Sequence, residues 1–225
     1  MPVSTTTDDF VSVAPKDLVF PRMTFEEFLE WSDEDTHAEW VDGKVVFLLG
    51  ASSRHQSLLY FLSRVVADWI EATGDKGAPF FAPFIMRCRV GMPGREPDLV
   101  YVCEENLGKI RKNYMEGAAD LAVEIVSPES VSRDHIEKFA EYEAGGVGEY
   151  WVIDITNDTA EFYIRDTPNA PYFRRAHLTN ATDGKRGLYT CDTLGGLQIN
   201  VDWLFADTLP TLTSIRREWE ANAVK

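Results

Sequence analysis

One short apolar run with a carboxylate inside it constrains this chain more than any other feature. Residues 121–126 read Leu-Ala-Val-Glu-Ile-Val, and Ser127-Pro128 closes the run. So short a run, β-branched at its end and stopped by a proline, predicts a strand that is buried on both faces. An unpaired carboxylate in such surroundings is costly. We therefore expect Glu124 to meet a cation, a hydrogen-bond donor or a metal ion.

The composition favours a folded domain in a reducing compartment. Apolar residues make up 44% of the 225 residues, which is ample for a packed core. The three cysteines form no CxxC pair, so neither a disulfide framework nor a zinc site is indicated. No apolar run approaches the roughly 20 residues of a membrane span. The polar, acidic N-terminus is unlike a signal peptide. We expect a cytoplasmic protein without membrane contact.

The net charge of −15 argues against non-specific nucleic-acid binding through a broad basic face. It leaves room for a local basic groove, or for a metal ion that screens a cluster of carboxylates.

Capping signals and helical periodicity predict four helices. The first follows Thr24, and the second runs from Ser52 or Ser53 to Gly74. The third runs from Ser132 to Ala144, and the fourth covers 211–222. Residues 39–47 predict a hairpin that turns at Asp42-Gly43. The other predicted strands lie at 80–90 with a break at Pro83, 99–103, 121–126, 149–154, 160–165, 172–178, 188–190 and 197–201. We expect 85–103 to form a second hairpin and 104–120 an irregular insert.

This order of elements predicts one α/β or α+β domain. Its central sheet is mixed and flanked by helices, and a β-rich extension follows it. The strand–helix–strand order over 121–153 favours a parallel crossover. We expect residues 1–20 to be a flexible arm, 21–205 the main domain, and 206–225 a C-terminal helix packed on it.

Two carboxylates are predicted to lie on neighbouring strands. Asp98 follows Pro97 and opens one apolar strand, and Glu124 lies inside the next. Two such acids can share Mg²⁺, which takes oxygen ligands. Without a cation they repel, and the pKa of one of them rises. Lys138 lies on the following helix and can reach the pair if that helix folds back over the sheet. Two acids, a metal ion and a lysine suit phosphodiester cleavage.

Each candidate residue also has a purely structural interpretation. Asp98 could cap a turn, and Glu124 could be a core acid paired with an Arg or Lys. Lys138 could be a surface partner of Asp134, an i,i+4 pair worth about 0.2–0.5 kcal/mol. Glu39 could be an ordinary hairpin residue, and His55 could bond near a helix end.

Several stretches together resemble a known family. They are Glu39-Trp40-Val41-Asp42-Gly43, Pro97-Asp98, Val123 to Pro128, Arg133-Asp134 with Lys138 and Tyr142, and Gly146 to Asp154. Over about residues 23–203 the chain resembles the Uma-type restriction endonucleases of the PD-(D/E)XK nuclease superfamily. The resemblance implies a restriction-endonuclease-like fold and a Mg²⁺-dependent DNA endonuclease, with Mn²⁺ able to substitute.

The resemblance also implies roles for individual residues. Asp98 and Glu124 match the two metal-binding acids, and the carbonyl of Ile125 is an expected further ligand. The lysine expected at Val126 has moved to Lys138. Glu39 matches an additional metal-binding acid, and His55 a histidine at the start of the second helix. We therefore expect Asp98, Glu124, Lys138, Glu39 and His55 to form the catalytic site.

Three functions remain open from the sequence. The first is the DNA endonuclease, expected to be a homodimer because double-strand cleavage usually needs two active sites. The second is a nuclease-fold binding module, weakly active or inactive, that acts through a protein partner. The third is a hydrolase of smaller phosphoesters. If DNA is bound, the expected contacts are Lys109, Arg111, Lys112 and Arg95.

Overall fold

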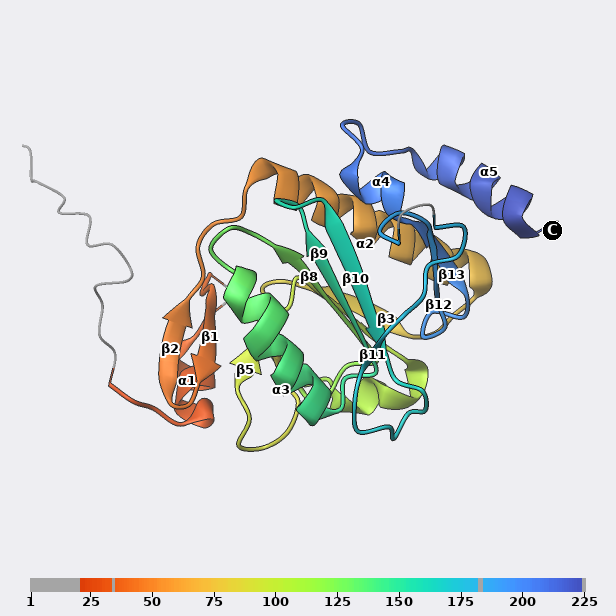
Figure 1. Ribbon diagram of the computed structural model, residues 1–225. Coiled ribbons are helices and arrows are strands. Elements are labelled where there is room, and N and C mark those ends of the chain that lie inside the picture. The colour runs from red at the N-terminus through yellow and green to blue at the C-terminus, as the bar shows by residue number, and fades with distance from the viewer. Residues whose placement is uncertain (1–20, 34, 182–183, 224–225) are drawn as a thin grey trace, which may run out of the picture.

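The computed structural model describes residues 21–33, 35–181 and 184–223. The predicted N-terminal arm lies outside this range. Within it, the strands form a six-stranded sheet, a five-stranded sheet and a two-stranded hairpin (Figure 1). None of the described helices combines the length and apolarity needed to cross a bilayer.

The six-stranded sheet is mixed, as predicted. Its strand order is β11-β10-β9-β8-β6-β3, and β8 pairs parallel with β9 but antiparallel with β6. All six residues of β8 are buried, which confirms a strand covered on both faces. The strands are β3 (Ala78–Phe81), β6 (Leu99–Val102), β8 (Leu121–Val126), β9 (Glu149–Asp154), β10 (Thr159–Ile164) and β11 (Arg174–Arg175).

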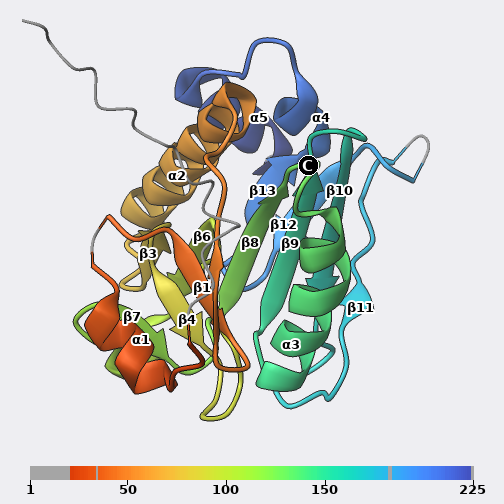
Figure 2. The same ribbon diagram turned by 90° about the vertical axis from the view of Figure 1, so that its left-hand side faces the viewer.

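Helices cover both faces of this sheet. α2 (Ser53–Thr73) shares one apolar cluster with Val123 and Ile125. α3 (Lys138–Gly145) lies over the other face, where Val126 shares a cluster with Tyr142. Figure 2 shows β8 and β9 between the two helices. Side chains alternate along a strand, so Glu124 faces α3 together with Val126.

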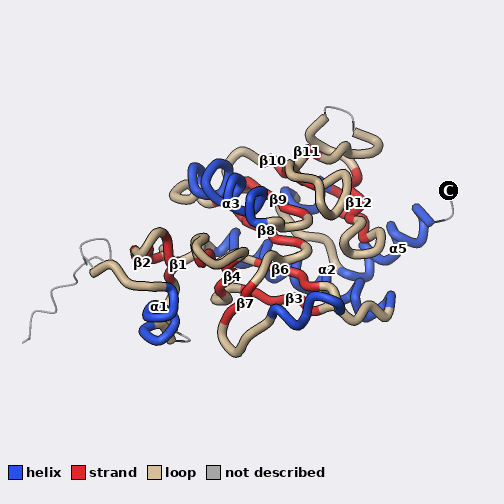
Figure 3. The backbone as a smooth tube through the Cα atoms, turned by 90° about the horizontal axis from the view of Figure 1, so that it is seen from below, coloured by secondary structure: helices blue, strands red, loops and turns tan. Residues whose placement is uncertain are grey.

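The five-stranded sheet lies beside the first and has the order β2-β1-β5-β4-β7. Figure 3 shows α1, β1 and β2 to one side of the molecule. The predicted capping box at Thr24 is present. The predicted hairpin is present too, with φ of +49° at Asp42 and +82° at Gly43, as its two-residue turn requires. The elements are α1 (Phe25–Trp31), β1 (Ala38–Val41), β2 (Lys44–Phe47), β4 (Ile85–Arg87), β5 (Gly94–Arg95) and β7 (Tyr114–Glu116).

The predicted hairpin over 85–103 is wrong. β4 pairs with β5, whereas β6 pairs with β3 and β8 in the other sheet. Pro97 lies between β5 and β6 and cannot donate to a ladder, so the chain leaves one sheet there and enters the other. The insert at 104–120 is more regular than predicted, because it holds the 3₁₀ helix η2 (Glu104–Lys109) and β7. The strand predicted at 172–178 shrinks to β11.

The helix after β8 begins differently from the prediction. Ser132 already has helical dihedrals and caps nothing. A π-helical turn, η3 (Arg133–Glu137), leads into α3, and the N–H of Lys138 donates to the carbonyl of Arg133. The C-terminal part comprises β12 (Leu188–Cys191), β13 (Leu197–Asn200), the unpredicted α4 (Val201–Phe205) and α5 (Leu212–Ala223). Ile215 of α5 is buried in the cluster that contains α2.

Candidate active site

The structure brings Asp98 and Glu124 together at one end of the β6–β8 pair. Leu99 of β6 lies opposite Val123 of β8. Asp98 comes just before Leu99 and Glu124 just after Val123, so the antiparallel register places the two acids next to each other. The backbone N–H of Ile125 donates to Asp98 Oδ2 over 2.7 Å. Asp98 keeps some solvent access, with 17% of its side chain exposed.

Glu124 is buried and is held from α3. Its Oε1 accepts hydrogen bonds from Lys138 Nζ at 2.8 Å and from the Tyr142 hydroxyl at 2.9 Å. No described residue donates a hydrogen bond to its Oε2. Burial raises the pKa of Glu124 well above its usual range; Lys138 opposes this rise, and the charges of Asp134 and Asp98 add to it. Burial therefore favours the protonated form of this carboxyl group by more than Lys138 opposes it.

Lys138 is a buried cation and no surface partner of Asp134. Only 2% of the residue is exposed. Its Nζ lies 2.8 Å from Glu124 Oε1, 3.1 Å from Glu39 Oε1 and 3.8 Å from Asp134 Oδ1. Burial lowers the pKa of Lys138, but Glu124, Glu39 and Asp134 raise it by more. The ammonium therefore stays protonated near neutral pH.

Glu39 reaches Lys138 from β1 and is held by a second cation. Its Oε2 accepts from Arg95 at 2.8 Å, and its Oε1 accepts from the backbone N–H of Glu96 at 3.2 Å. Burial raises the pKa of Glu39, but Lys138 and Arg95 lower it by more, to about 2. Both oxygens are occupied, which favours holding Lys138 over the predicted role as a metal ligand.

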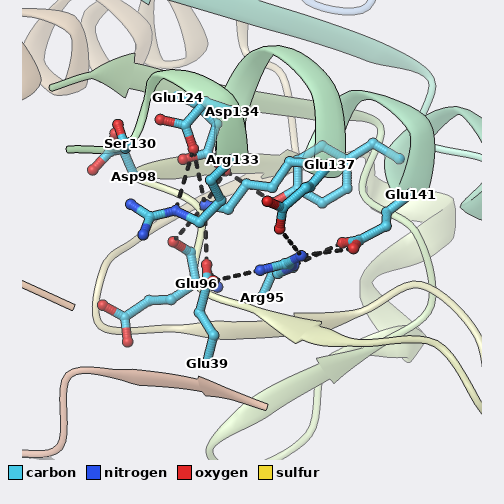
Figure 4. Close-up of polar contacts among 12 residues, drawn as sticks. Glu39, Arg95, Glu96, Asp98, Glu124, Ser130, Arg133, Asp134, Glu137 and Glu141 are labelled. Carbon is cyan, nitrogen blue, oxygen red and sulfur yellow. Dashed lines mark hydrogen bonds and ion pairs between the residues drawn. The ribbon is translucent and has the colours of Figure 1, made fainter. Parts of the chain in front are cut away.

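The structure contradicts the predicted role of Arg95 more clearly than that of any other candidate residue. Arg95 was expected to contact DNA, yet only 2% of it is exposed. Its guanidinium pairs with Glu39, Glu137 and Glu141, and it donates twice to Glu141. Figure 4 shows this bridge from Glu39 to Glu137 at the end of η3 and Glu141 of α3. Arg95 is a buried structural cation paired with three carboxylates, and a phosphate at the surface cannot reach it.

We expect Glu39→Gln to flatten the acid side of the stability curve. The pKa of Glu39 is about 2 in the folded protein, against an ordinary value of 4.5. Because the folded state favours the ionised form, its contribution is complete above about pH 4.5 and is lost as the pH falls toward 2. At about 1.4 kcal/mol per pH unit this amounts to roughly 3 kcal/mol.

Urea unfolding between pH 2 and pH 7 measures this contribution. Glu30→Gln changes an exposed carboxylate and should keep the wild-type acid dependence. If Glu39→Gln also kept that dependence, the assigned ion pairs of Glu39 would be wrong.

His55 approaches Asp98 from the first turn of α2. The Ser52 hydroxyl caps this helix by accepting from the His55 N–H. His55 Nε2 lies 3.2 Å from both carboxylate oxygens of Asp98. Burial lowers the pKa of His55, but the nearby Asp98 carboxylate raises it by more. The imidazole therefore holds Asp98 in place from the α2 side.

The donors around Asp98 suit a hard cation. Continuing the register by two residues places Pro97 opposite Ile125. Proline has no N–H, so the Ile125 carbonyl gains no ladder donor from that side. No set of three or more His, Cys, Asp or Glu among the described residues is arranged to hold a metal. Two carboxylates, one carbonyl and several waters nevertheless fit Mg²⁺, which usually retains water.

The predicted basic insert lies away from this site. Asp120, at the far end of β8, accepts from the Cys103 N–H and from Asn106. The insert therefore follows the opposite end of β6 from Asp98, roughly 13 Å along a four-residue strand. Lys109 donates to the Ala118 carbonyl, and Arg111 to the Gly108 carbonyl. Contact between DNA and Lys109, Arg111 or Lys112 stays a prediction, but it would lie away from the two acids.

Sequence reasoning missed three residues of the site. Tyr142 belongs to a stretch that carries the family resemblance but was given no role, yet its hydroxyl donates to Glu124. Asp134 is 2% exposed and lies beside Lys138, and Arg133 reaches Asp134 Oδ1 at 3.6 Å. The i, i+4, i+8 spacing of Asp134, Lys138 and Tyr142 was the available signal. Figure 4 shows the carboxylates of Glu39, Glu124 and Asp134 converging.

Comparison with known proteins places this chain in a family. The family model Uma2, described as "Putative restriction endonuclease", matches residues 25–202. A crystal structure described as a putative nuclease belonging to DUF820 from Anabaena variabilis has a TM-score of 0.64 and 18% sequence identity. That match covers 81% of this chain and 97% of the other, and at this identity it shows the shared fold alone. No curated protein matches the chain. The match over most of its length shows that the chain belongs to the Uma2 family, whose members are described as putative restriction endonucleases.

Proposed function

We propose that this protein is a Mg²⁺-dependent DNA endonuclease. One observation supports the proposal above the others: Asp98, Glu124 and Lys138 are far apart in sequence, yet they meet at one end of a sheet. The 2.7 Å bond from Ile125 links Asp98 to the Glu124 strand, and Lys138 lies 2.8 Å from Glu124. Membership of the Uma2 family favours the same function.

The proposed mechanism gives each residue a separate task. Asp98, Glu124 and the Ile125 carbonyl would hold the ion, and Mn²⁺ could replace Mg²⁺. The bound ion supplies Lewis-acid stabilisation of charge on the phosphate. Lys138 stays protonated, so we assign it to charge stabilisation and to orienting Glu124. His55 holds Asp98, and Tyr142 holds the same oxygen of Glu124 as Lys138 does.

Cleavage of duplex DNA by the purified full chain tests this proposal. We expect phosphodiester cleavage with Mg²⁺ or Mn²⁺ and none with EDTA. Nucleotide monoesters serve as the comparison, and faster hydrolysis of these than of DNA would favour the small-phosphoester hydrolase. Absence of cleavage on every substrate would contradict the endonuclease. Light scattering of the same sample tests the proposed homodimer.

Mn²⁺ and protons are expected to compete for Glu124. Burial raises the pKa of Glu124, and a metal ion favours the ionised carboxylate, so ion and proton compete. Affinity should therefore rise with pH. Calorimetry in buffers of different ionisation enthalpy measures the released proton. Glu124→Gln should abolish the release, whereas a binding module without a metal site would show no heat that depends on Asp98 or Glu124.

A further inference from the structure

The two buried cations of the site are only 2% exposed, so neither can reach a substrate. Lys138 contacts Glu124, Glu39 and the Glu96 carbonyl, and Arg95 contacts three carboxylates. Their charges are matched by the acids around them. Apart from the proposed metal ion, a DNA phosphate entering this site would therefore need a further, more exposed cation to bind it.

Arg133 differs from these two cations in both exposure and bonding. It lies on the π-helical turn η3, and 27% of its side chain is exposed. Its Nε is buried without a hydrogen-bond partner among the described residues. Asp134 Oδ1 lies 3.6 Å from this Nε, beyond hydrogen-bonding distance, and that oxygen is likewise buried without a hydrogen-bond partner among the described residues. A buried polar atom left unpaired is costly, so such a pair calls for an explanation.

The geometry around Arg133 also links it to the acids of the site. Its charge contributes to lowering the pKa of Glu39, so the guanidinium lies within electrostatic reach of that buried carboxylate. Figure 4 shows its Nε edge toward Asp134, while the two terminal nitrogens have no drawn contact. A planar guanidinium can use one edge for a carboxylate and present the other to a phosphate.

We propose that Arg133 is a substrate-binding residue that contacts a phosphate of the DNA backbone next to the Asp98–Glu124 pair, and that Asp134 positions its guanidinium. This inference rests on the proposed endonuclease function and adds the site's own contact to its substrate. The phosphate draws the terminal nitrogens of Arg133 inward, and the Nε edge closes on Asp134. The π-helical turn matters because it presents Arg133, Asp134 and Lys138 from one short segment.

Cleavage kinetics and DNA binding test this inference together. We expect Arg133→Ala to weaken binding of duplex DNA by about tenfold to hundredfold. Fluorescence anisotropy of a fluorescein-labelled duplex, with Ca²⁺ in place of Mg²⁺, measures this affinity. Loss of one phosphate contact should reduce the slope of log K against log salt by about 0.9. Cleavage by Arg133→Ala should fall correspondingly, and added guanidinium should partly restore it. Arg133→Lys should retain part of the binding as a point charge.

Two controls separate this role from a structural one. Arg217→Ala removes an exposed arginine on α5, which packs on the α2 side of the sheet, and should leave binding unchanged. Asp134→Asn should weaken binding less than Arg133→Ala, because it removes only the positioning group. Wild-type affinity and salt slope in Arg133→Ala would overturn the inference.

The DNA-binding measurement also distinguishes failure of this inference from failure of the proposed endonuclease function. Wild-type protein that binds duplex DNA without cleaving it would overturn the endonuclease, and the Arg133 variants would then be judged by affinity alone. Wild-type protein that neither binds nor cleaves DNA would overturn both.

Discussion

Asp98→Asn is expected to slow Mg²⁺-dependent DNA cleavage by about 1,000-fold or more while the fold is retained. The amide keeps the shape of the side chain and can still accept the hydrogen bond from Ile125. It loses the negative charge that holds a divalent ion. A 1,000-fold loss corresponds to about 4 kcal/mol of lost transition-state stabilisation. Single-turnover cleavage of a DNA duplex, with thermal unfolding of the same sample, measures both effects.

Asp120→Asn provides a matched control for this variant. Asp120 lies at the other end of the same strand pair and bonds to Cys103 and Asn106. Its replacement should cost some stability but leave cleavage close to the wild-type rate. If Asp98→Asn cleaved DNA as fast as the wild type, or if both variants lost activity equally, the assigned site would be wrong.

Lys138→Met is expected to destabilise the protein by about 3–5 kcal/mol. The substitution keeps an unbranched side chain of similar length but removes the ammonium, so Glu124 and Glu39 lose their shared partner inside the protein. Breaking a buried ion pair from one side usually costs this much. Urea unfolding at pH 7 measures the difference in the free energy of unfolding.

The double variant Lys138→Met with Glu124→Gln tests the cause of that loss. Removing the carboxylate as well should recover a substantial part of the stability, because one uncompensated charge is gone. Lys112→Met, at an exposed position, should change stability by less than about 0.5 kcal/mol. A Lys138→Met protein as stable as the wild type would mean that the ammonium is not buried between these acids.

Much of the fold is encoded in local patterns. The run at 121–126 predicted β8 with both faces covered, and the carboxylate within it predicted the buried partners on α3. Thr24 with Glu27 predicted the start of α1, and Asp42-Gly43 predicted the turn between β1 and β2. Each signal acts over a few residues, so the sequence carries it directly.

Long-range pairing was harder to predict. Residues 85–103 have the pattern of a hairpin, yet β4 and β6 join different sheets. The role of Arg95 depends on three carboxylates, and the sequence cannot show that they lie beside it. They are Glu39 of β1, Glu137 of η3 and Glu141 of α3. The sequence alone therefore left Arg95 as an expected DNA contact, whereas in the folded protein Glu137 of η3 and Glu141 of α3 pair with it. The π-helical turn was also missed, because no local capping signal marks it.

Anomalous diffraction from a crystal soaked in Mn²⁺ shows whether Asp98 and Glu124 hold a divalent ion. We expect one anomalous peak within bonding distance of Asp98, Glu124 and the Ile125 carbonyl, and its loss in Asp98→Asn. Saturating Mn²⁺ with no peak between the two carboxylates, or with a peak only elsewhere on the molecule, would rule out the proposed metal site.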